Sequence, residues 1–267
     1  MTAHLSNDWL LFDAPVSDRV AREDLWRLLG LNATLSGFSK FVLTPRRSFH
    51  LRADVPLSEE DDNMVSEEIV SQEALDAKLA AHLGEICSSL KAAYGLFRGE
   101  DLARCSSALT GDRGEHQAED LRRTCTETGW PFIERAAGKM MIELEAQDSF
   151  HQAVVEQSSA GIRLSVEIAR FDDFESISRQ AVSALLLTTG AQVRLARPSV
   201  DEQAVGRFEV MFATLPVVSE LRHALSSLSI ACAMCGREAL ALQDENIARQ
   251  YLAYTESPTN FSLSIGL

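Results

Sequence analysis

The chain carries one order of predicted secondary structure twice. Both passes read as a strand, a helix, two strands on either side of a proline, and a long helix. In the first pass these elements are predicted at residues 9–12, 18–30, 41–43, 49–55 and 70–97. In the second pass they are predicted at residues 162–171, 174–190, 193–196 and 208–213, followed by a long helix from Val217.

Single residues repeat at nearly the same offset. Gly30 and Gly190 stand 160 residues apart, as do Pro56 and Pro216, and Phe49 and Phe208 stand 159 apart. A repeat of this length indicates a duplicated domain rather than a solenoid unit. We therefore expect a scaffold with two related surfaces, and a single catalytic pocket becomes a less favoured hypothesis.

The two copies are predicted to be unequal and separated by a linker. Residues 1–98 form a first, shortened copy, and residues 117–267 form a second, complete copy. Residues 99–116 are rich in glycine and polar side chains, and such a composition buries too little apolar surface to fold by itself. In the first copy, the acidic run at residues 59–62 is interpreted as a solvated loop, with contact to a basic partner as the alternative.

The second copy is predicted to begin with a surface helix at residues 118–128, which Gly129 ends. In residues 140–145, Met140, Ile142 and Leu144 alternate with more polar positions, the period of a strand with one exposed face. Further strand-like runs follow at residues 150–157 and 162–169. The fold class expected from these patterns is α+β, with two tandem copies of an antiparallel sheet flanked by helices.

The closing helix has the clearest apolar stripe in the chain. Its members alternate steps of four and three residues: Leu221, Leu225, Leu228, Cys232, Cys235, Ala239 and Leu242. Cys232 and Cys235 form a C-x-x-C motif, which in other contexts is a redox dithiol or half of a zinc site. Because both lie within the apolar stripe, far from a helix N-terminus, we interpret them as buried core thiols.

The charge balance restricts the class of partner. The chain has 25 Lys plus Arg against 39 Asp plus Glu, a net charge of −14, and residues 1–110 already carry a net charge of −6. Nucleic acids and anionic membranes are bound through clustered cations, so neither is expected as a partner. A protein or peptide segment with basic residues is the better electrostatic match.

Composition and cysteine count point to a cytoplasmic protein. No apolar run approaches the ~20 residues that a membrane-spanning helix requires, and residues 1–15 lack the pattern of a secretory signal. The odd number of cysteines, five, fits free thiols in a reducing compartment.

The chain lacks the usual sequence motifs of catalysis. Its six histidines are scattered, with no H-E-x-x-H motif and no histidine evident beside a candidate nucleophile, and no glycine-rich phosphate loop follows a strand. We therefore predict no catalytic, cofactor-binding or metal-binding residues, and a protein that is not an enzyme. The alternative is a small-molecule enzyme or ligand-binding protein with a site between the two copies.

The element order of the second copy resembles the type III secretion chaperone-like fold, which class I (Tir-type) secretion chaperones share with the YbjN proteins. The segment L-R-R-T-C-T-E-T-G-W-P-F-I-E at residues 121–134 carries the resemblance, together with residues 139–144 and 162–171. The full pattern covers residues 117–254, and residues 9–97 match in part. The first copy lacks the opening helix and the first two strands, and the family's chaperones are mostly single-domain homodimers.

The resemblance implies an intramolecular pseudo-dimer that holds a partner polypeptide without catalysis and without a cofactor. An extended partner segment would lie on exposed sheet faces or edges. Met141 and Met211 are the candidate partner-binding residues, because both are predicted on the solvent faces of their strands and methionine adapts to varied partners. The predicted middle helices, at residues 18–30 and 174–190, are expected to pack against each other, since the second is apolar on more than one face.

Overall fold

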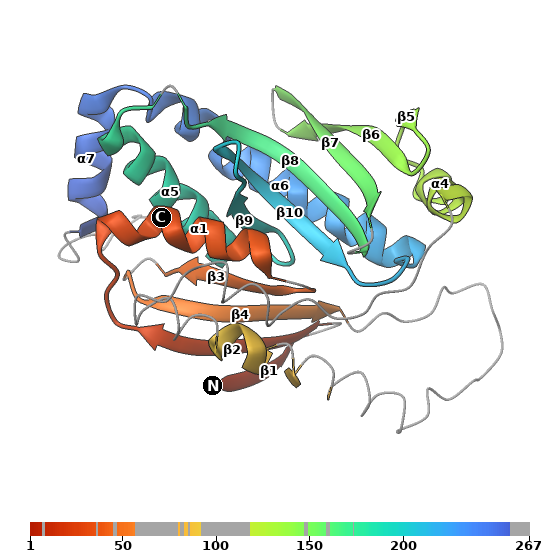
Figure 1. Cartoon of the computed structure of the whole chain (residues 1–267), viewed down its shortest axis with the longest axis horizontal. Coiled ribbons are helices and arrows are strands. Elements are labelled where there is room, and N and C mark those ends of the chain that lie inside the picture. Colours follow the sequence, from red (N-terminus) through yellow and green to blue (C-terminus); the bar gives the residue numbers. More distant parts are fainter. Residues whose placement is uncertain are drawn as a thin grey trace, which may run out of the picture.

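The computed structural model describes residues 1–6, 9–35, 37–44, 47–56, 118–146, 149–158, 161–172 and 174–256, together with parts of residues 80–91. The described chain has an α+β fold with two antiparallel sheets, one of four strands and one of six. The predicted fold class is thereby confirmed. Two helices, α1 (Leu25–Thr34) and α5 (Ser176–Gln192), lie between the sheets (Figure 1).

The first sheet has the strand order β1-β2-β4-β3. Its strands are β1 (Thr2–Ser6), β2 (Trp9–Ser17), β3 (Ser39–Leu43) and β4 (Phe49–Pro56). Phe49, Leu51, Ala53 and Val55 alternate along β4 and are buried, which gives this sheet an apolar face. On β3, all five residues are buried, because the second copy covers the other face of the strand.

One helix predicted in the first copy was wrong in its bounds. The helix predicted at residues 18–30 begins later: a short 3₁₀ turn, η1 (Arg22–Asp24), precedes α1, which continues past Gly30 to Thr34. Strand β1, which pairs antiparallel with β2 through Leu5 and Leu10, was not predicted. The short run at residues 2–6 has no alternation strong enough to signal an edge strand.

The second sheet has the strand order β5-β6-β7-β8-β10-β9, with β5 and β9 at its edges. Its strands are β5 (Phe132–Ala136), β6 (Lys139–Ala146), β7 (Ser149–Ser158), β8 (Gly161–Arg170), β9 (Arg197–Val200) and β10 (Val205–Phe212). The alternation predicted in β6 is confirmed, since Met140, Ile142 and Leu144 are buried and the residues between them are not.

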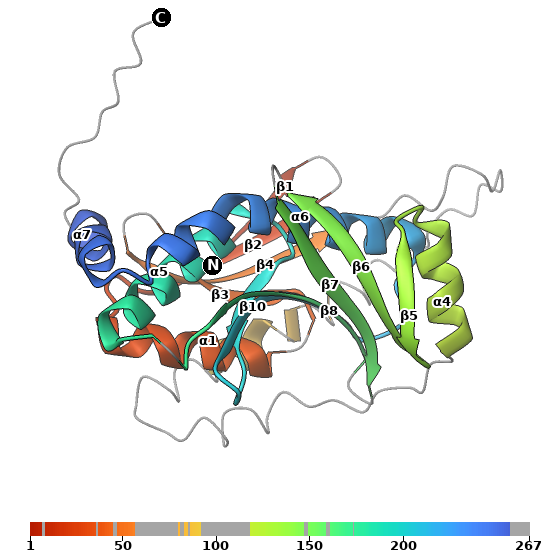
Figure 2. The same cartoon turned by 90° about the horizontal axis from the view of Figure 1, so that it is seen from above.

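One face of the second sheet is covered by helix α6 (Val218–Ala241), which runs across β6, β7, β8 and β10 (Figure 2). The seven residues of the predicted stripe are all buried against this face or at the helix end. Helix α4 (Ala118–Glu127) packs beside α6 at the far end of the sheet, and Gly129, at a φ of 80°, ends it as expected.

The closing helical region is two helices rather than one. Helix α6 ends at Ala241, and α7 (Glu245–Glu256) begins after a turn at Leu242 and Gln243. Asp244 Oδ1 accepts hydrogen bonds from the backbone N–H groups of Asn246, at 2.8 Å, and Ile247, at 3.2 Å. This N-cap stabilises the first turn of α7 and explains why a continuous helical pattern breaks here.

The two copies pack against each other reciprocally. Helix α1 of the first copy lies on β9 of the second, helix α5 of the second lies on β3 of the first, and the two helices contact each other. The ring of Trp26 on α1 meets Phe171 edge-on at 4.8 Å between ring centroids. The predicted contact between the middle helices is therefore confirmed.

Residues 193–196, predicted as a strand, are not one. The strand β9 begins at Arg197, and Pro198 lies inside it rather than between two strands. Because β9 is an edge strand, the missing N–H of Pro198 removes no ladder bond from a central strand. Residues 193–196 form hydrogen bonds with the first copy instead of a strand ladder. Leu195, at a φ of 56°, donates its N–H to Asp54 at 2.9 Å.

Several predicted segments lie outside the described residues. They include the acidic run at 59–62, the linker at 99–116 and most of the long helix predicted at 70–97. Within that helix, residues 86–91 are helical and Ile86 is buried in the core. Among the described helices, none is both long and apolar enough to cross a lipid bilayer.

Candidate functional site

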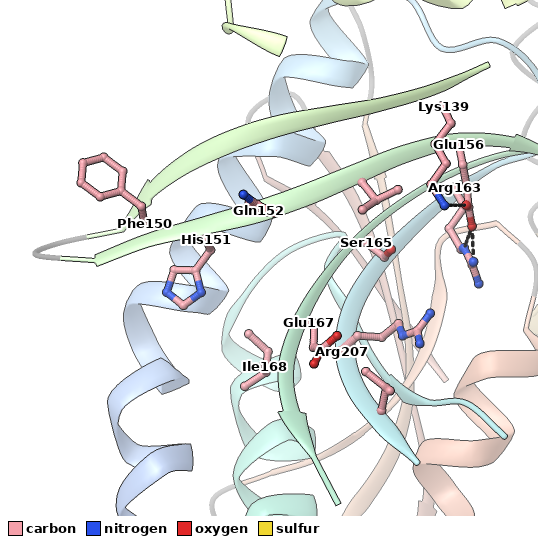
Figure 3. A pocket seen from close by; sticks show the side chains of 12 residues that line it. Lys139, Phe150, His151, Gln152, Glu156, Arg163, Ser165, Glu167, Ile168 and Arg207 are labelled. Atoms are coloured by element: carbon pink, nitrogen blue, oxygen red, sulfur yellow. Dashed lines mark hydrogen bonds and ion pairs between the residues drawn. The ribbon is translucent and has the colours of Figure 1, made fainter. Parts of the chain in front are cut away.

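The surface of the second sheet opposite α6 is hollowed into a cleft of about 500 Å³ (Figure 3). We call this surface the open face. The cleft is lined from β6, β7, β8 and β10, and its principal side chains are Lys139, Phe150, Val154, Glu156, Arg163 and Arg207. Antiparallel pairing places alternate residues of neighbouring strands on the same side, so the open face includes the row Met141, Val154 and Ser165. Helix α6 contacts β6 and β7 from the opposite side of the sheet.

Each cation in the cleft has a carboxylate partner. Glu156 accepts a hydrogen bond from Arg163 Nε at 2.9 Å, and Lys139 Nζ lies 3.3 Å from its other oxygen (Figure 3). Burial raises the pKa of Glu156, but its hydrogen bonds and charge interactions with Arg163 and Lys139 outweigh burial and leave the pKa lowered. Arg207 pairs in turn with Asp201. Lys139, Arg163 and Arg207 are thus each paired with a carboxylate of this chain.

Carboxylates without an ion-pair partner among the described residues stand at the other end of the open face. Glu143 and Glu145 are exposed on β6, on the same side as Met141. Glu145 lies opposite Phe150, whose side chain is 68% exposed, and Glu143 lies opposite Gln152. This end of the open face is therefore both apolar and acidic.

The two methionines predicted as partner-binding residues share the open face but do not touch. Met141 on β6 pairs with Val154, while Met211 on β10 pairs with Arg163, so strands β7 and β8 lie between them. Both side chains are half-buried. Met141 is also flanked by Ile133 of the edge strand β5, which is 60% exposed, and its sulfur accepts a hydrogen bond from Arg135. Sequence reasoning missed Ile133 and Phe150, although both occupy the alternating outward positions.

The contact between the copies is filled by buried charged groups. Lys40 Nζ lies 2.6 Å from Asp54 Oδ2 within the first copy and also donates to the backbone carbonyl of Val193 in the second. Arg197 and Glu209 form the corresponding pair in the second copy, 3.1 Å apart, and Arg197 donates to the carbonyl of Ser39 in the first.

Each of these buried cations thus pairs with a carboxylate of its own copy and donates to a main-chain oxygen of the other. The registers differ, since Arg197 lies directly opposite its partner Glu209, whereas Lys40 lies opposite Arg52 and its partner Asp54 is two residues further along β4. Burial lowers the pKa of Lys40, and the charge of Asp54 opposes this. These groups satisfy one another, which is how buried charges are tolerated.

A serine and a histidine do lie together, contrary to the sequence prediction. Ser48 Oγ is 3.0 Å from His50 Nε2, and His50 Nδ1 is 3.0 Å from both carboxylate oxygens of Asp13. The order of contacts matches that of a Ser-His-Asp triad. The signal in the sequence was the spacing of two residues, which in extended backbone at the start of β4 turns Ser48 and His50 to one side.

The surroundings of this group favour a structural role. Asp13 also accepts a hydrogen bond from Arg52 Nε at 2.9 Å, and Ser48 Oγ lies 2.6 Å from Thr44 Oγ1 across the β3–β4 turn. The same tripeptide, S-F-H, recurs at residues 149–151, where Ser149 Oγ lies 3.1 Å from His151 Nε2. The serine–histidine contact is therefore common to the starts of two strands, β4 and β7, each of which follows a hairpin connection.

The cysteine motif is buried as predicted. Cys232 and Cys235 are free thiols in the core, and burial raises the pKa of Cys232 to about 12 and that of Cys235 further. Thiols with such raised pKa values are poor nucleophiles at neutral pH. Among the described residues, no group of three or more His, Cys, Asp or Glu side chains is arranged to hold a metal ion.

Comparison with known proteins found no matching family model, no matching curated protein and no matching solved structure.

Proposed function

We propose that the protein is a non-catalytic protein-binding module of secretion-chaperone type, which holds an extended segment of a partner polypeptide on the open face. The observation that carries the proposal is the cleft of about 500 Å³ on the side of the second sheet away from α6. A sheet normally buries both faces or keeps one face polar. Here the exposed face combines Phe150, Val154 and Met141 with charged residues, a composition suited to binding.

The pseudo-dimer supports this function because it leaves the open face available. The copies bury β3 and β9 against each other's middle helix, at the opposite edge of the second sheet from β5 and β6. The β9 edge of the second sheet would then serve the contact between copies, and the β5 edge the contact with a partner. A partner segment on the open face would reach Ile133 on edge strand β5, where added main-chain hydrogen bonds are available.

The charges of the open face favour a basic segment. The cations of the cleft already pair with Glu156 and Asp201, whereas Glu143 and Glu145 have no ion-pair partner among the described residues. Lysine or arginine side chains of a partner would pair with these two carboxylates, and apolar side chains between them would contact Met141 and Phe150. We therefore expect a segment in which apolar and basic residues alternate.

Selection from a library of displayed random peptides tests the proposal. Wild-type protein should enrich peptides that alternate apolar and basic residues, and these peptides should protect β6 and β7 from amide hydrogen exchange. As a control, the selection is repeated with protein carrying Glu143→Gln and Glu145→Gln, which should lose the preference for basic residues. Enrichment of peptides that protect only α4, α6 or α7 would contradict the proposal.

A further inference from the structure

Two arginines of the first copy converge on one carboxylate of the second. Arg22 lies in η1 and Arg47 lies between β3 and β4, and both contact Glu256, the last residue of α7. Arg22 donates from Nε and Nη2 to the two carboxylate oxygens, and Arg47 donates from Nη1 to Oε1 at 2.7 Å. We call Arg22 and Arg47 the arginine pair. A guanidinium that donates two parallel hydrogen bonds, with a second guanidinium beside it, suits carboxylate and phosphate groups.

The charges at the arginine pair do not balance. Two guanidinium groups carry two positive charges and Glu256 supplies one negative charge, so one positive charge remains. Within the described part of the chain, neither arginine forms an ion pair with another carboxylate. Arg47 is the more buried of the two, with 14% of its side chain exposed, and its Nη2 is buried without a hydrogen-bond partner among the described residues. A buried N–H group of this kind is costly, so a ligand that accepts from it gains affinity.

Glu256 is held at this position by the arginine pair and not by its own helix. The helix dipole opposes a negative charge in the last turn of a helix, and the last turn of α7 contains no basic residue. Hydrogen bonds from Arg22 and Arg47 lower the pKa of Glu256 to about 2, so its carboxylate is charged at neutral pH. The side chain is 34% exposed, so solvent screens the contact and a competing anion can reach it.

We propose that Arg22 and Arg47 form a binding site for a phosphate group, and that Glu256 occupies this site as an internal substitute until a phosphate displaces it. A phosphate monoester carries about two negative charges at neutral pH, which match the two guanidinium groups. Its additional oxygens accept from Arg47 Nη2 as well as from the N–H groups that bind Glu256. The site shares no residue with the open face and does not depend on the function proposed for that face.

Titration of the full-length protein with inorganic phosphate, followed by ³¹P nuclear magnetic resonance, tests the proposal. Glu256→Ala should bind phosphate more tightly than wild type, by up to about fivefold, because Glu256 occupies the site in a fraction of wild-type molecules. Arg22→Met and Arg47→Met should each weaken binding by about tenfold or more, since each removes a charged donor. Arg22 is the more exposed of the two, at 37%, so Arg22→Met remains informative even if Arg47→Met does not fold.

Glu245→Ala is the matched control. Glu245 lies at the other end of α7, where it pairs with Arg249 and is 42% exposed, so the variant removes the same charge from the same helix. It should bind phosphate as wild type does. Sulfate should compete with phosphate, and chloride at the same ionic strength should compete less. Equal affinity of wild type, Glu256→Ala and Arg22→Met, or no binding to Glu256→Ala, would overturn the proposal.

A phosphorylated side chain presents the same group as free phosphate, and a second titration distinguishes these sources. N-acetyl-phosphoserine amide should bind wild type and depend on Arg22 in the same way. Tighter binding of this compound than of inorganic phosphate would assign the site to a phosphorylated polypeptide, and weaker binding would assign it to free phosphate. Binding of neither compound would overturn the proposal, and the peptide selection on the open face would be unaffected.

Discussion

Lys40 and Asp54 form an ion pair that is almost completely buried, with 2.6 Å between Nζ and Oδ2. The pair joins the copies, because Lys40 also donates to the carbonyl of Val193 and Asp54 accepts from the N–H of Leu195. The second copy contributes to the interface through Arg197, which donates to Ser39. The contact between the two sheets and their middle helices is thus specified by directional polar contacts as well as by apolar packing.

Replacement of Lys40 by Met should destabilise the protein strongly. The substitution leaves the Asp54 carboxylate buried with one remaining donor, Leu195, and removal of one partner of a buried pair costs roughly 3–5 kcal/mol. The measurement is the free energy of unfolding in urea. Arg170→Met, which removes an exposed pair with Glu167, serves as the control and should be close to wild type. Equal effects of the two substitutions would show that the buried pair has no special role.

Glu256 should contribute to the stability of the fold at neutral pH and lose this contribution in acid. Hydrogen bonds from Arg22 and Arg47 lower its pKa from 4.5 to about 2, although burial opposes this. Since the folded pKa is the lower one, the contribution is complete above pH 4.5 and is lost as the pH falls towards 2. The side chain is 34% exposed, so screening limits the effect to about 1 kcal/mol or less.

Denaturation of wild type and Glu256→Gln at a series of pH values measures this contribution. The difference in unfolding free energy between the two proteins should shrink as the medium becomes acidic. A difference that stays constant down to pH 2 would mean that the arginines do not act on the carboxylate.

Cys232 and Cys235 should resist thiol reagents in the native protein. Both are buried with raised pKa values, so little thiolate forms at neutral pH. Cys87, which is exposed, is the internal control and should label rapidly. Replacement of both buried cysteines by Ala should lower stability by roughly 1–3 kcal/mol, as small core truncations do, and leave partner binding unchanged. Rapid native labelling of Cys232 would contradict their burial.

Ser48 should not behave as a catalytic nucleophile. Its hydroxyl is shared with Thr44, and the carboxylate that would orient His50 is shared with Arg52. We therefore expect no covalent labelling by a fluorophosphonate probe, which reacts with activated serines. Stoichiometric labelling that disappears in Ser48→Ala and in His50→Ala would instead identify a hydrolase and would favour the alternative of an enzyme.

The strongly periodic parts of the fold were predictable from the sequence, because local patterns decide them. The stripe of α6 and the alternation of β6 directly encode which side is buried. The bounds of α1 and the break before α7 were missed, since the first depends on a 3₁₀ turn and the second on the cap by Asp244. The segment 193–196 is apolar enough for a strand, but its polar contacts are with Lys40 and Asp54 of the other copy.

The candidate site was predictable only in part. Outward positions such as Met141 follow from alternation, and the order of the strands brings Met211 to the same face. The cleft itself depends on the pairing of strands distant in sequence and on the curvature of the sheet, which no local pattern contains. The neutralisation of Lys139 and Arg163 by Glu156 likewise appears only when β6, β7 and β8 lie side by side.

The central claim, that a polypeptide segment binds the open face, is tested most directly by fluorescence anisotropy with a short probe peptide in which valine and lysine alternate. The probe should bind wild type, bind Met141→Ser more weakly, and bind Ile230→Ser as well as wild type. Ile230 is a matched control, since it is 52% exposed on α6, the helix that covers the opposite face of the sheet.

Binding should weaken as salt rises, because exposed charges are screened over about 8 Å at physiological ionic strength, and a part should persist through apolar contact. Met211→Ser should also reduce the affinity of the same probe if the segment extends across the whole open face. Equal affinity of wild type, Met141→Ser and Met211→Ser for the probe, or no binding of the probe to wild type at any salt concentration, would contradict the claim.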